Sequence, residues 1–459
     1  MSTFMPRRFA LSLVLPLALV CFPLALAGCN HPSPACPPNQ TQCGAACFNL
    51  QSDSNNCGAC GAFCSTDQVC VAGACTYDTC SQPDVYATCL QGAGLVGVCS
   101  ATGFQLPTAT ISAPSPDAGS DLVIGELASS VFVGDAGSLW LLDYENSQID
   151  IVNVSSWPPV AANAQSIYAG VTGTFDPIQL ITCDGMVLVL RQESALLEGF
   201  DAQTHALSGE VSLVFSDAGG FYSPGAAACD GDHKVYVTDS ANNLVTAIDL
   251  SQIDSTGHFA IAAQTTLPAS DYPAALPDGG TISPYLTAIA VSTGVAPFVV
   301  VALENLGPDY NPAAPATVFR IDPALQTWSS PGNPGATCEN TFSITTSPDQ
   351  TTTYEACAGI FDTASATTVQ PGNANGYVGV TTIAGPTAQT PIKTTLSNPT
   401  SLAFLRNGLL AIGDDFSDAR IAFYNPADGG VTYASVACPG LADGGINPLQ
   451  TISSVVAAP

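Results

Sequence analysis

Val235-Tyr236-Val237-Thr238-Asp239, followed after Ser-Ala-Asn-Asn-Leu by Val245-Thr246-Ala247-Ile248-Asp249, is the stretch of sequence that decides the fold. Each run is rich in β-branched residues and ends on an aspartate, and the residues between them favour a turn. The stretch therefore predicts a β-hairpin. Similar pairs of runs recur along the chain, with the closing residues ten or eleven positions apart in most copies. They lie at 139–143 with 149–153, 187–191 with 197–201, 410–414 with 421–425, and, with a longer loop, 299–304 with 318–322.

A further apolar run precedes each hairpin. These runs lie at 129–133, 178–183, 226–229, 286–291, 341–345 and 401–405, and a seventh, at 451–456, ends the chain. Short strands that recur about every fifty residues are typical of propeller blades, each of which is a four-stranded antiparallel sheet. Helical periodicity is nearly absent after residue 120. The sequence therefore predicts an all-β fold, a β-propeller of seven blades.

The predicted seventh blade has only one strand at the end of the chain, so another segment must complete it. The candidate is the stretch 85–112, which would join the two ends of the domain and cover an exposed sheet edge. Six blades with an unrelated linker is the alternative. A β-sandwich is a third option, although it would not explain repeats over about 300 residues.

The best hairpin, 235–239 with the following Asn243, resembles the YVTN-type propellers of surface-layer and exported bacterial proteins. The resemblance is good for the third predicted blade and degenerate in the others. The fifth, around residues 341–383, departs most and carries an insertion. The resemblance implies a propeller fold and an exported protein.

Eight cysteines lie within residues 36–75, where large apolar residues are scarce. Such a segment cannot build a hydrophobic core, so we expect disulfides to hold it together, in pairings that the sequence does not resolve. The eight are Cys36, Cys43, Cys47, Cys57, Cys60, Cys64, Cys70 and Cys75. Zinc is the alternative, because Cys57-Gly58-Ala59-Cys60 is a CxxC motif, but the segment contains no histidine.

The run Cys43-Gly44-Ala45-Ala46-Cys47, followed by Asn55-Asn56-Cys57-Gly58-Ala59-Cys60-Gly61, resembles the cysteine-rich repeat of the plant stigma-specific secreted proteins. The same repeat is abundant in lipoproteins and secreted proteins of myxobacteria. The resemblance implies a small, extracellular, disulfide-bonded module, and it implies no catalysis. A rigid spacer is as good an interpretation of this module as a ligand-binding one.

The remaining cysteines suggest further cross-links. Cys89 and Cys99 would face each other across a hairpin, and Cys338 and Cys357 flank the turn of another. Cys183-Asp184-Gly185 and Cys229-Asp230-Gly231 occupy equivalent places in adjacent predicted blades and could pair. Cys438 could then meet Cys80 near the closure of the ring.

The N-terminus has the layout of a secretory signal peptide, with Arg7 and Arg8 before an apolar run. Leu26-Ala27-Gly28-Cys29 follows and resembles the lipobox of bacterial lipoproteins. The resemblance implies cleavage before Cys29 and acylation of that cysteine, which would anchor the chain to a membrane. An uncleaved membrane helix is the alternative, although two prolines interrupt the apolar run. Asn30 follows Cys29, at the position where an aspartate would be the signal for retention in the inner membrane. Asparagine at this position favours the outer membrane or cell surface.

The charge balance excludes several partners. The 459 residues carry a formal net charge of −29, with 8 Lys+Arg against 37 Asp+Glu. A chain this acidic has no basic surface for phosphate backbones, so nucleic acid is excluded as a partner. Anionic lipid headgroups would repel it, so contact with the membrane must come from the acyl chains. The 18 cysteines indicate an oxidising compartment.

No catalytic motif stands out. His205, His233 and His258 belong to no paired metal motif, and His233 is best placed on a solvated turn. Asp230 and Asp232 resemble the start of a calcium loop, but the acidic series stops too early for an EF-hand. Residues 216–221 faintly resemble the Asp-box turn of sialidases. We assign no catalytic residue, no metal site and no cofactor; Ca²⁺ could bind among the 37 carboxylates but cannot be localised.

Together these observations predict five segments. They are a lipoprotein signal peptide at 1–28, a lipidated tether at 29–35, the cysteine-rich module at 36–75, a linker with candidate blade-closing strands at 76–120, and the propeller at 121–459. The predicted function is non-enzymatic: a lipid-anchored cell-envelope protein displays the propeller to an extracellular or periplasmic protein or glycan. A metal-dependent, lactonase-like hydrolase or lyase and a purely structural envelope protein are the alternatives.

Overall fold

The computed structural model contains two compact units, a cysteine-rich segment and a large β unit. The residues that it describes are 41–43, 46–48, 50–51, 56–64, 68–71, 73–77, 82–89, 95–100, 104–105, 112–114, 121–123, 127–133, 137–143, 148–155, 177–214, 222–268, 283–293, 297–306, 312–329, 338, 340–358, 377–382, 390–396, 398–414, 420–436 and 452–458. Within these ranges, no helix has the length and hydropathy needed to cross a membrane. The predicted signal peptide and tether, including Cys29, lie outside the described residues.

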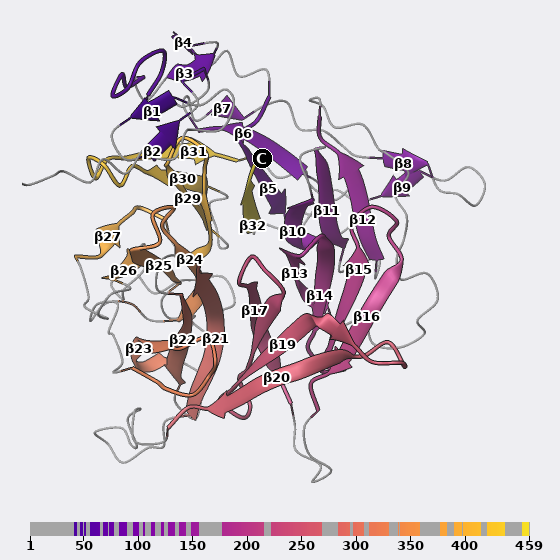
Figure 1. Ribbon diagram of the computed structural model, residues 1–459. Helices are drawn as coiled ribbons and strands as arrows, with labels where there is room; N and C mark the ends of the chain where they lie inside the picture. The colour runs from indigo at the N-terminus through magenta and orange to yellow at the C-terminus, as the bar shows by residue number, and fades with distance from the viewer. Residues whose placement is uncertain are drawn as a thin grey trace, which may run out of the picture. The chain divides into compact units, whose positions relative to one another are not determined.

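The large unit is a seven-bladed β-propeller (Figure 1), as the sequence predicted. Blades 1 to 3 are β10(Leu127–Val133)-β11(Ser138–Asp143)-β12(Gln148–Asn153), β13(Pro177–Cys183)-β14(Met186–Arg191)-β15(Leu196–Asp201)-β16(Leu207–Ser212) and β17(Pro224–Cys229)-β18(Lys234–Asp239)-β19(Leu244–Ile253)-β20(Phe259–Thr266). Blades 4 to 6 are β21(Ser283–Ser292)-β22(Phe298–Leu306)-β23(Pro312–Ile321), β24(Thr341–Thr346)-β25(Thr352–Cys357)-β26(Tyr377–Thr382)-β27(Ile392–Lys393) and β28(Pro399–Phe404)-β29(Leu410–Asp414)-β30(Arg420–Tyr424)-β31(Val431–Ser435).

Blade 7 is built from both ends of the unit. Its order is β32(Ile452–Ala457)-β5(Val85–Cys89)-β6(Leu95–Cys99)-β7(Phe104–Gln105), and β32 pairs antiparallel with β5. The hydroxyls of Thr88 and Ser453 add a 2.8 Å hydrogen bond across this junction. The predicted closure is therefore confirmed, and the six-blade and sandwich alternatives are wrong. Only the end of the predicted donor stretch differs, because Ser112 belongs to β8(Ser112–Pro114), which pairs with β9(Asp121–Val123).

The first strand of each blade lines the centre of the ring, and each of these strands packs against the first strand of the next blade. Polar side chains link them across the blade boundaries. The hydroxyls of Ser130 and Ser454 lie 3.0 Å apart, between blades 1 and 7. Gln179 Oε1 accepts a 2.7 Å hydrogen bond from the backbone N–H of Ala227, between blades 2 and 3. These bonds satisfy groups that the sheets themselves leave unpaired.

The aspartates that close the second strands have a structural role. Asp239 Oδ1 accepts a 3.1 Å hydrogen bond from the backbone N–H of Ser223, and Asp414 Oδ1 accepts one of 2.9 Å from Asn398. In both blades the donor directly precedes the proline that opens the first strand. The carboxylate thus ties the start of the innermost strand to the end of its neighbour.

The residues that close the third strands form a repeated Asx-turn. In five blades an Asp or Asn Oδ1 accepts a hydrogen bond of 2.9 to 3.0 Å from the backbone N–H two residues ahead. The five are Asn153, Asp201, Asp249, Asp322 and Asn425. The hydrogen bond from the Thr204 backbone is the largest of several that lower the pKa of Asp201. Some of the aspartates of this acidic chain therefore stabilise turns.

The hydrophobic core is distributed over the interfaces between blades. Trp140 packs between blades 1 and 2, Tyr236 and Phe319 between blades 3 and 4, and Phe423 between blades 6 and 7, all of them fully buried. Each blade is thus covered on both faces by its neighbours, which explains why its central strands are apolar on both sides.

The cysteine-rich segment contains two short hairpins, β1(Thr41–Cys43)-β2(Ala46–Phe48) and β3(Gln68–Val71)-β4(Ala74–Tyr77). Its Asn-Cys-Gly motif has a local reason. Asn56 Oδ1 accepts a 2.8 Å hydrogen bond from the Gly61 N–H. Gly58 has a φ of +74°, and a Cβ at this position would overlap the carbonyl oxygen of Gly73.

Blades 2 and 3 interlock through Phe259. Its ring is 3% exposed and rests on Gly199 and Gly209 of blade 2; a Cβ at Gly209 would lie 2.7 Å from the ring. We predict that Gly209→Ala lowers the free energy of unfolding by about 1–3 kcal/mol, because the ring or the strand must move. Urea unfolding measures this. The neighbouring Ser208→Ala is the control, and a Gly209→Ala variant as stable as this control would contradict the interlock.

Two buried acids lie in the interface between blades 4 and 5. Glu355 pairs across the sheet with Ile344, which packs against Val300 and Ala302 of blade 4. Glu304 follows on the same face of β22 as Ala302. The two carboxyl groups are 0% and 4% exposed respectively. Desolvation raises the pKa of each from 4.5 to about 8.

The raised pKa values predict a falling stability with rising pH. The folded protein retains protons that the unfolded chain releases above pH 4.5, so the stabilisation is complete below that pH and is lost as the pH rises through about 8. Each group changes the free energy of unfolding by at most about 1.4 kcal/mol per pH unit. Urea unfolding at pH 5 to 8 should show this slope, and a Glu304→Gln, Glu355→Gln variant should flatten it. An unchanged slope in the variant would contradict the assignment.

Candidate functional site

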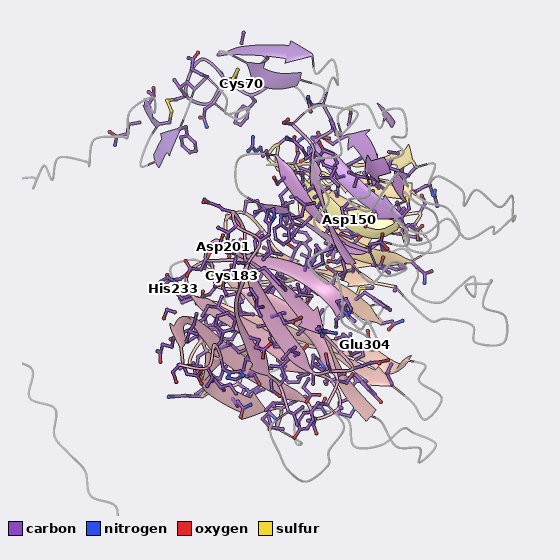
Figure 2. All side chains as sticks on the ribbon, turned by 90° about the vertical axis from the view of Figure 1, so that its right-hand side faces the viewer. Cys70, Asp150, Cys183, Asp201, His233 and Glu304 are labelled. Atoms are coloured by element: carbon purple, nitrogen blue, oxygen red, sulfur yellow. A yellow bond between two sulfur atoms is a disulfide. The ribbon has the colours of Figure 1, made fainter. Side chains whose placement is uncertain are left out.

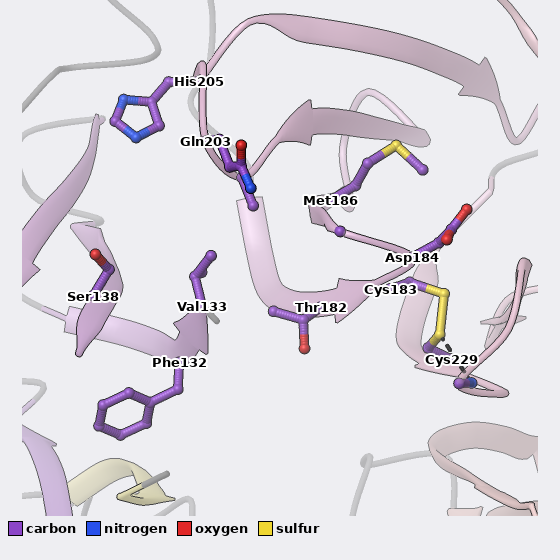
Figure 3. Close-up of a pocket in the computed structure, with 13 residues that line it drawn as sticks. Phe132, Val133, Ser138, Thr182, Cys183, Asp184, Met186, Gln203, His205 and Cys229 are labelled. Carbon is purple, nitrogen blue, oxygen red and sulfur yellow. Dashed lines mark hydrogen bonds between the residues drawn. A yellow bond between two sulfur atoms is a disulfide. The ribbon is translucent and has the colours of Figure 1, made fainter. Parts of the chain in front are cut away.

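A pocket of about 900 Å³ opens where the first strands of blades 1 to 3 turn into their second strands. Residues from four turns and their flanking strand ends, β10–β11, β13–β14, β15–β16 and β17–β18, line it: Phe132, Val133, Ser138, Thr182, Cys183, Asp184, Gly185, Met186, Ala202, Gln203, His205, Cys229 and Gly231. Figure 3 shows Phe132 and Ser138 on one side of this space, the Cys183–Cys229 disulfide on the other, and Thr182 and Gln203 between them. The volume is in the range of small-molecule binding sites.

The disulfide between Cys183 and Cys229 forms one wall of the pocket. It joins the end of β13 to the end of β17, in adjacent blades, with the two Cα atoms 5.6 Å apart. The backbone N–H of Gly231 donates a 3.2 Å hydrogen bond to Cys229 Sγ. This is the pairing expected from the equivalent positions of the two cysteines, and it holds two blades together at the pocket.

Beside the disulfide, His233 lies between two carboxylates. Its Nδ1 is 2.7 Å from Asp184 Oδ2, and its Nε2 is 3.2 Å from Asp232 Oδ1. The hydrogen bond with Asp184 is the largest cause of the raised pKa of His233. The turn is solvated, as the sequence suggested, since the imidazole is 46% exposed. The partner Asp184, 49 residues away in the chain, could not be recognised from the sequence.

Asp230, which precedes this turn, makes two backbone hydrogen bonds. Its Oδ1 accepts hydrogen bonds from the backbone N–H groups of Asp232, at 2.9 Å, and Lys234, at 3.0 Å. It therefore caps the β17–β18 turn that carries His233. Figure 2 shows Cys183, Asp201 and His233 gathered on one side of the propeller and Glu304 on the other.

On the opposite wall, His205 covers Trp140. The two rings meet edge to face with centroids 5.3 Å apart. Hydrogen bonds from Gln203 and Thr204 to Asp201 fix the turn that leads to His205, and His205 itself has a φ of +61°. Trp140 belongs to the core between blades 1 and 2, so His205 connects the surface of the pocket with the hydrophobic core beneath it.

The other cysteines predicted as disulfide candidates are distributed as follows. Disulfides join Cys43 to Cys60, Cys57 to Cys70 and Cys338 to Cys357. Cys64, Cys75, Cys89 and Cys99 are also disulfide-bonded. Both cysteines of the CxxC motif are thus in disulfides, which does not leave them as thiolates for zinc. Four sequence-based predictions fall outside the described residues. They concern Cys36, the Cys80–Cys438 pairing, the Asp-box-like residues 216–221 and the side chain of Cys47.

Comparison with known proteins identifies the module and the fold. Residues 24–78 match the family model described as the stigma-specific STIG1-like protein family. No curated protein matches the chain. Among solved structures, a putative 6-phosphogluconolactonase from Bacteroides fragilis is similar, with a TM-score of 0.50 and 11% identity over 83% of this chain and 99% of that one.

Two further solved structures match the chain with lower TM-scores. Hydrazine synthase from Kuenenia stuttgartiensis has a TM-score of 0.41 and 16% identity, over 65% of this chain and 76% of that one. Apo AztD from Citrobacter koseri has a TM-score of 0.46 and 9% identity, over 82% and 97% of the two chains. By its own sheet topology the chain is a seven-bladed β-propeller, and the family model at residues 24–78 shows that it carries a STIG1-like cysteine-rich module.

The disulfide at the pocket should contribute to stability. We predict that a Cys183→Ser, Cys229→Ser variant loses about 2–4 kcal/mol of unfolding free energy, because the cross-link closes a loop of 46 residues. Thermal and urea unfolding test this. A Cys338→Ser, Cys357→Ser variant, which opens a loop of 19 residues, should lose less. An equal or larger loss in this second variant would contradict the role given to loop length.

Proposed function

We propose that this protein is a lipid-anchored component of the cell envelope whose propeller binds an extracellular or periplasmic protein or glycan through the pocket on blades 1 to 3. The observation that carries the proposal is the pocket itself. Turns from three blades, far apart in the sequence, meet around one concave space of about 900 Å³. An inter-blade disulfide and the Asp184–His233 pair hold the turns of blades 2 and 3 together.

The chemistry of the lining supports binding. Apolar groups (Phe132, Val133 and Met186) alternate with a few polar ones, among them Thr182 and Gln203. This mixture is typical of ligand sites, in which apolar walls provide affinity and a few polar groups set orientation.

The place of action is proposed from the N-terminal sequence. Leu26-Ala27-Gly28-Cys29 has the form of a lipobox, and acyl chains on Cys29 would hold the chain at a membrane despite its charge of −29. The disulfides of the cysteine-rich segment and of blades 2, 3 and 5 agree with an oxidising compartment.

The anchor is tested with a Cys29→Ala variant expressed in a bacterium that processes lipoproteins. Without the thiol that receives the lipid, the protein should leave the membrane fraction and be recovered in soluble form. Fractionation followed by immunoblotting measures this. A variant that stays with the membrane would contradict the anchor and favour the uncleaved helix.

Binding is tested with a pair of tryptophan substitutions at equivalent positions. Gln203 and Ala427 both lie two residues after an Asx-turn acceptor, in blades 2 and 6, and both are exposed. Gln203 lines the pocket and Ala427 does not. On peptide and glycan arrays, Gln203→Trp should abolish binding that Ala427→Trp retains. Identical array profiles for the two variants would contradict a ligand site at the pocket.

A further inference from the structure

We infer that the pocket recognises a lysine side chain of a protein partner, whose ammonium group competes with His233 for the carboxylate of Asp184. The inference rests on the proposed function, since it names the ligand of the same pocket. It is carried by the charge of the lining, by the apolar walls and by the arrangement of Asp184 and His233.

The charge of the lining is negative. Among the described residues that line the pocket, Asp184 is the only carboxylate and none is a lysine or an arginine. His205 is the other titratable group. A positive group of a ligand would find Asp184, in a protein with a net charge of −29, whereas a negative group would meet no lysine or arginine among these lining residues.

The walls fit an aliphatic stem better than a sugar. Phe132, Val133, Met186 and Ala202 line the same pocket as Asp184, together with the disulfide. Methylene groups can rest against such walls while the charged head reaches the margin. A sugar would place hydroxyl groups against them, and each hydroxyl without a partner carries a desolvation cost.

The geometry of Asp184 favours lysine over arginine. One carboxylate oxygen, Oδ2, is already 2.7 Å from His233 Nδ1. The guanidinium of arginine binds a carboxylate best through both oxygens, whereas the ammonium of lysine is a point charge that needs only one. The carboxylate is 39% exposed, so the ammonium group can reach it from the open side.

His233 makes the affinity depend on pH. Below its raised pKa, the imidazolium neutralises Asp184. As the pH rises, the imidazole loses its charge while the lysine ammonium keeps its own, so the ligand should bind more tightly. The charged groups around His233 are Asp184, Asp230, Asp232, Lys234 and Asp249, from the two turns and from β18 and β19.

The test uses the mature protein and the peptide Ac-Gly-Lys-Gly-NH₂, with its Nε-acetylated form as the neutral analogue, measured by isothermal titration calorimetry. The lysine peptide should bind at least about fivefold more tightly than the acetylated one. Asp184→Asn should remove this preference. Asp428→Asn is the control, because it changes the net charge equally at an exposed turn of blade 6.

The pH profile separates this role from a structural one. Between pH 5.5 and 8.5 the affinity of the original protein should rise, and His233→Gln should bind tightly at both pH values. A parallel His205→Gln variant measures the contribution of the opposite wall. A flat profile in the original protein, equal binding of the acetylated peptide, or an Asp184→Asn variant that behaves like Asp428→Asn would each overturn the inference.

Failure of this inference can be told from failure of the proposed function. A neutral oligosaccharide or peptide that binds, and that Gln203→Trp blocks, would leave the pocket as a ligand site and overturn only its lysine specificity. If no ligand on the arrays distinguishes Gln203→Trp from Ala427→Trp, both proposals fail.

Discussion

The pairing of β32 with β5 is the contact on which the rest of the propeller depends. Each blade covers its apolar faces only by packing against two neighbours, so an open ring would expose the faces of the first and last blades to water. Joining a C-terminal strand to three strands from the start of the unit removes both open ends at once. Residues more than 360 positions apart, such as Thr88 and Ser453, thereby become neighbours.

Local roles of the carboxylates account for part of the acidic composition of the chain. Many of its carboxylates are engaged in repeated local tasks and are not left to repel one another. Asp239 and Asp414 hold the start of an innermost strand, and Asp201 and Asp249 cap turns at the blade edges. Because the blades repeat, the same carboxylate hydrogen bond can recur from blade to blade, and each copy needs only one acid at one register position. Two acids, Glu304 and Glu355, depart from this pattern because burial between blades 4 and 5 keeps them protonated.

Much of the fold could be predicted because most blades are formed by strands that follow one another directly in the sequence. The hairpin at 235–249 can be recognised by its β-branched residues, its turn and its two closing aspartates. The recurrence of similar strands along the chain indicates the number of blades. Even the completion of blade 7 was predictable, since a single leftover strand requires a partner. The cross-link between Cys183 and Cys229 was likewise suggested by equivalent positions in adjacent repeats. The pocket as a whole could not be predicted, because Phe132 and His205 come from parts of blades 1 and 2 that share no motif with the Cys-Asp-Gly turns of Asp184 and Gly231.

The sequence by itself determined the architecture, since strand periodicity, turn residues and cysteine spacing act over a few residues and repeat along the chain. Only the tertiary structure decided which of these residues meet. Asp184 and His233 lie 49 residues apart, and nothing in either local sequence indicates the 2.7 Å contact between them. That contact exists because the rotation from one blade to the next brings equivalent turns side by side around the ring, where two unremarkable turns become the margin of one pocket.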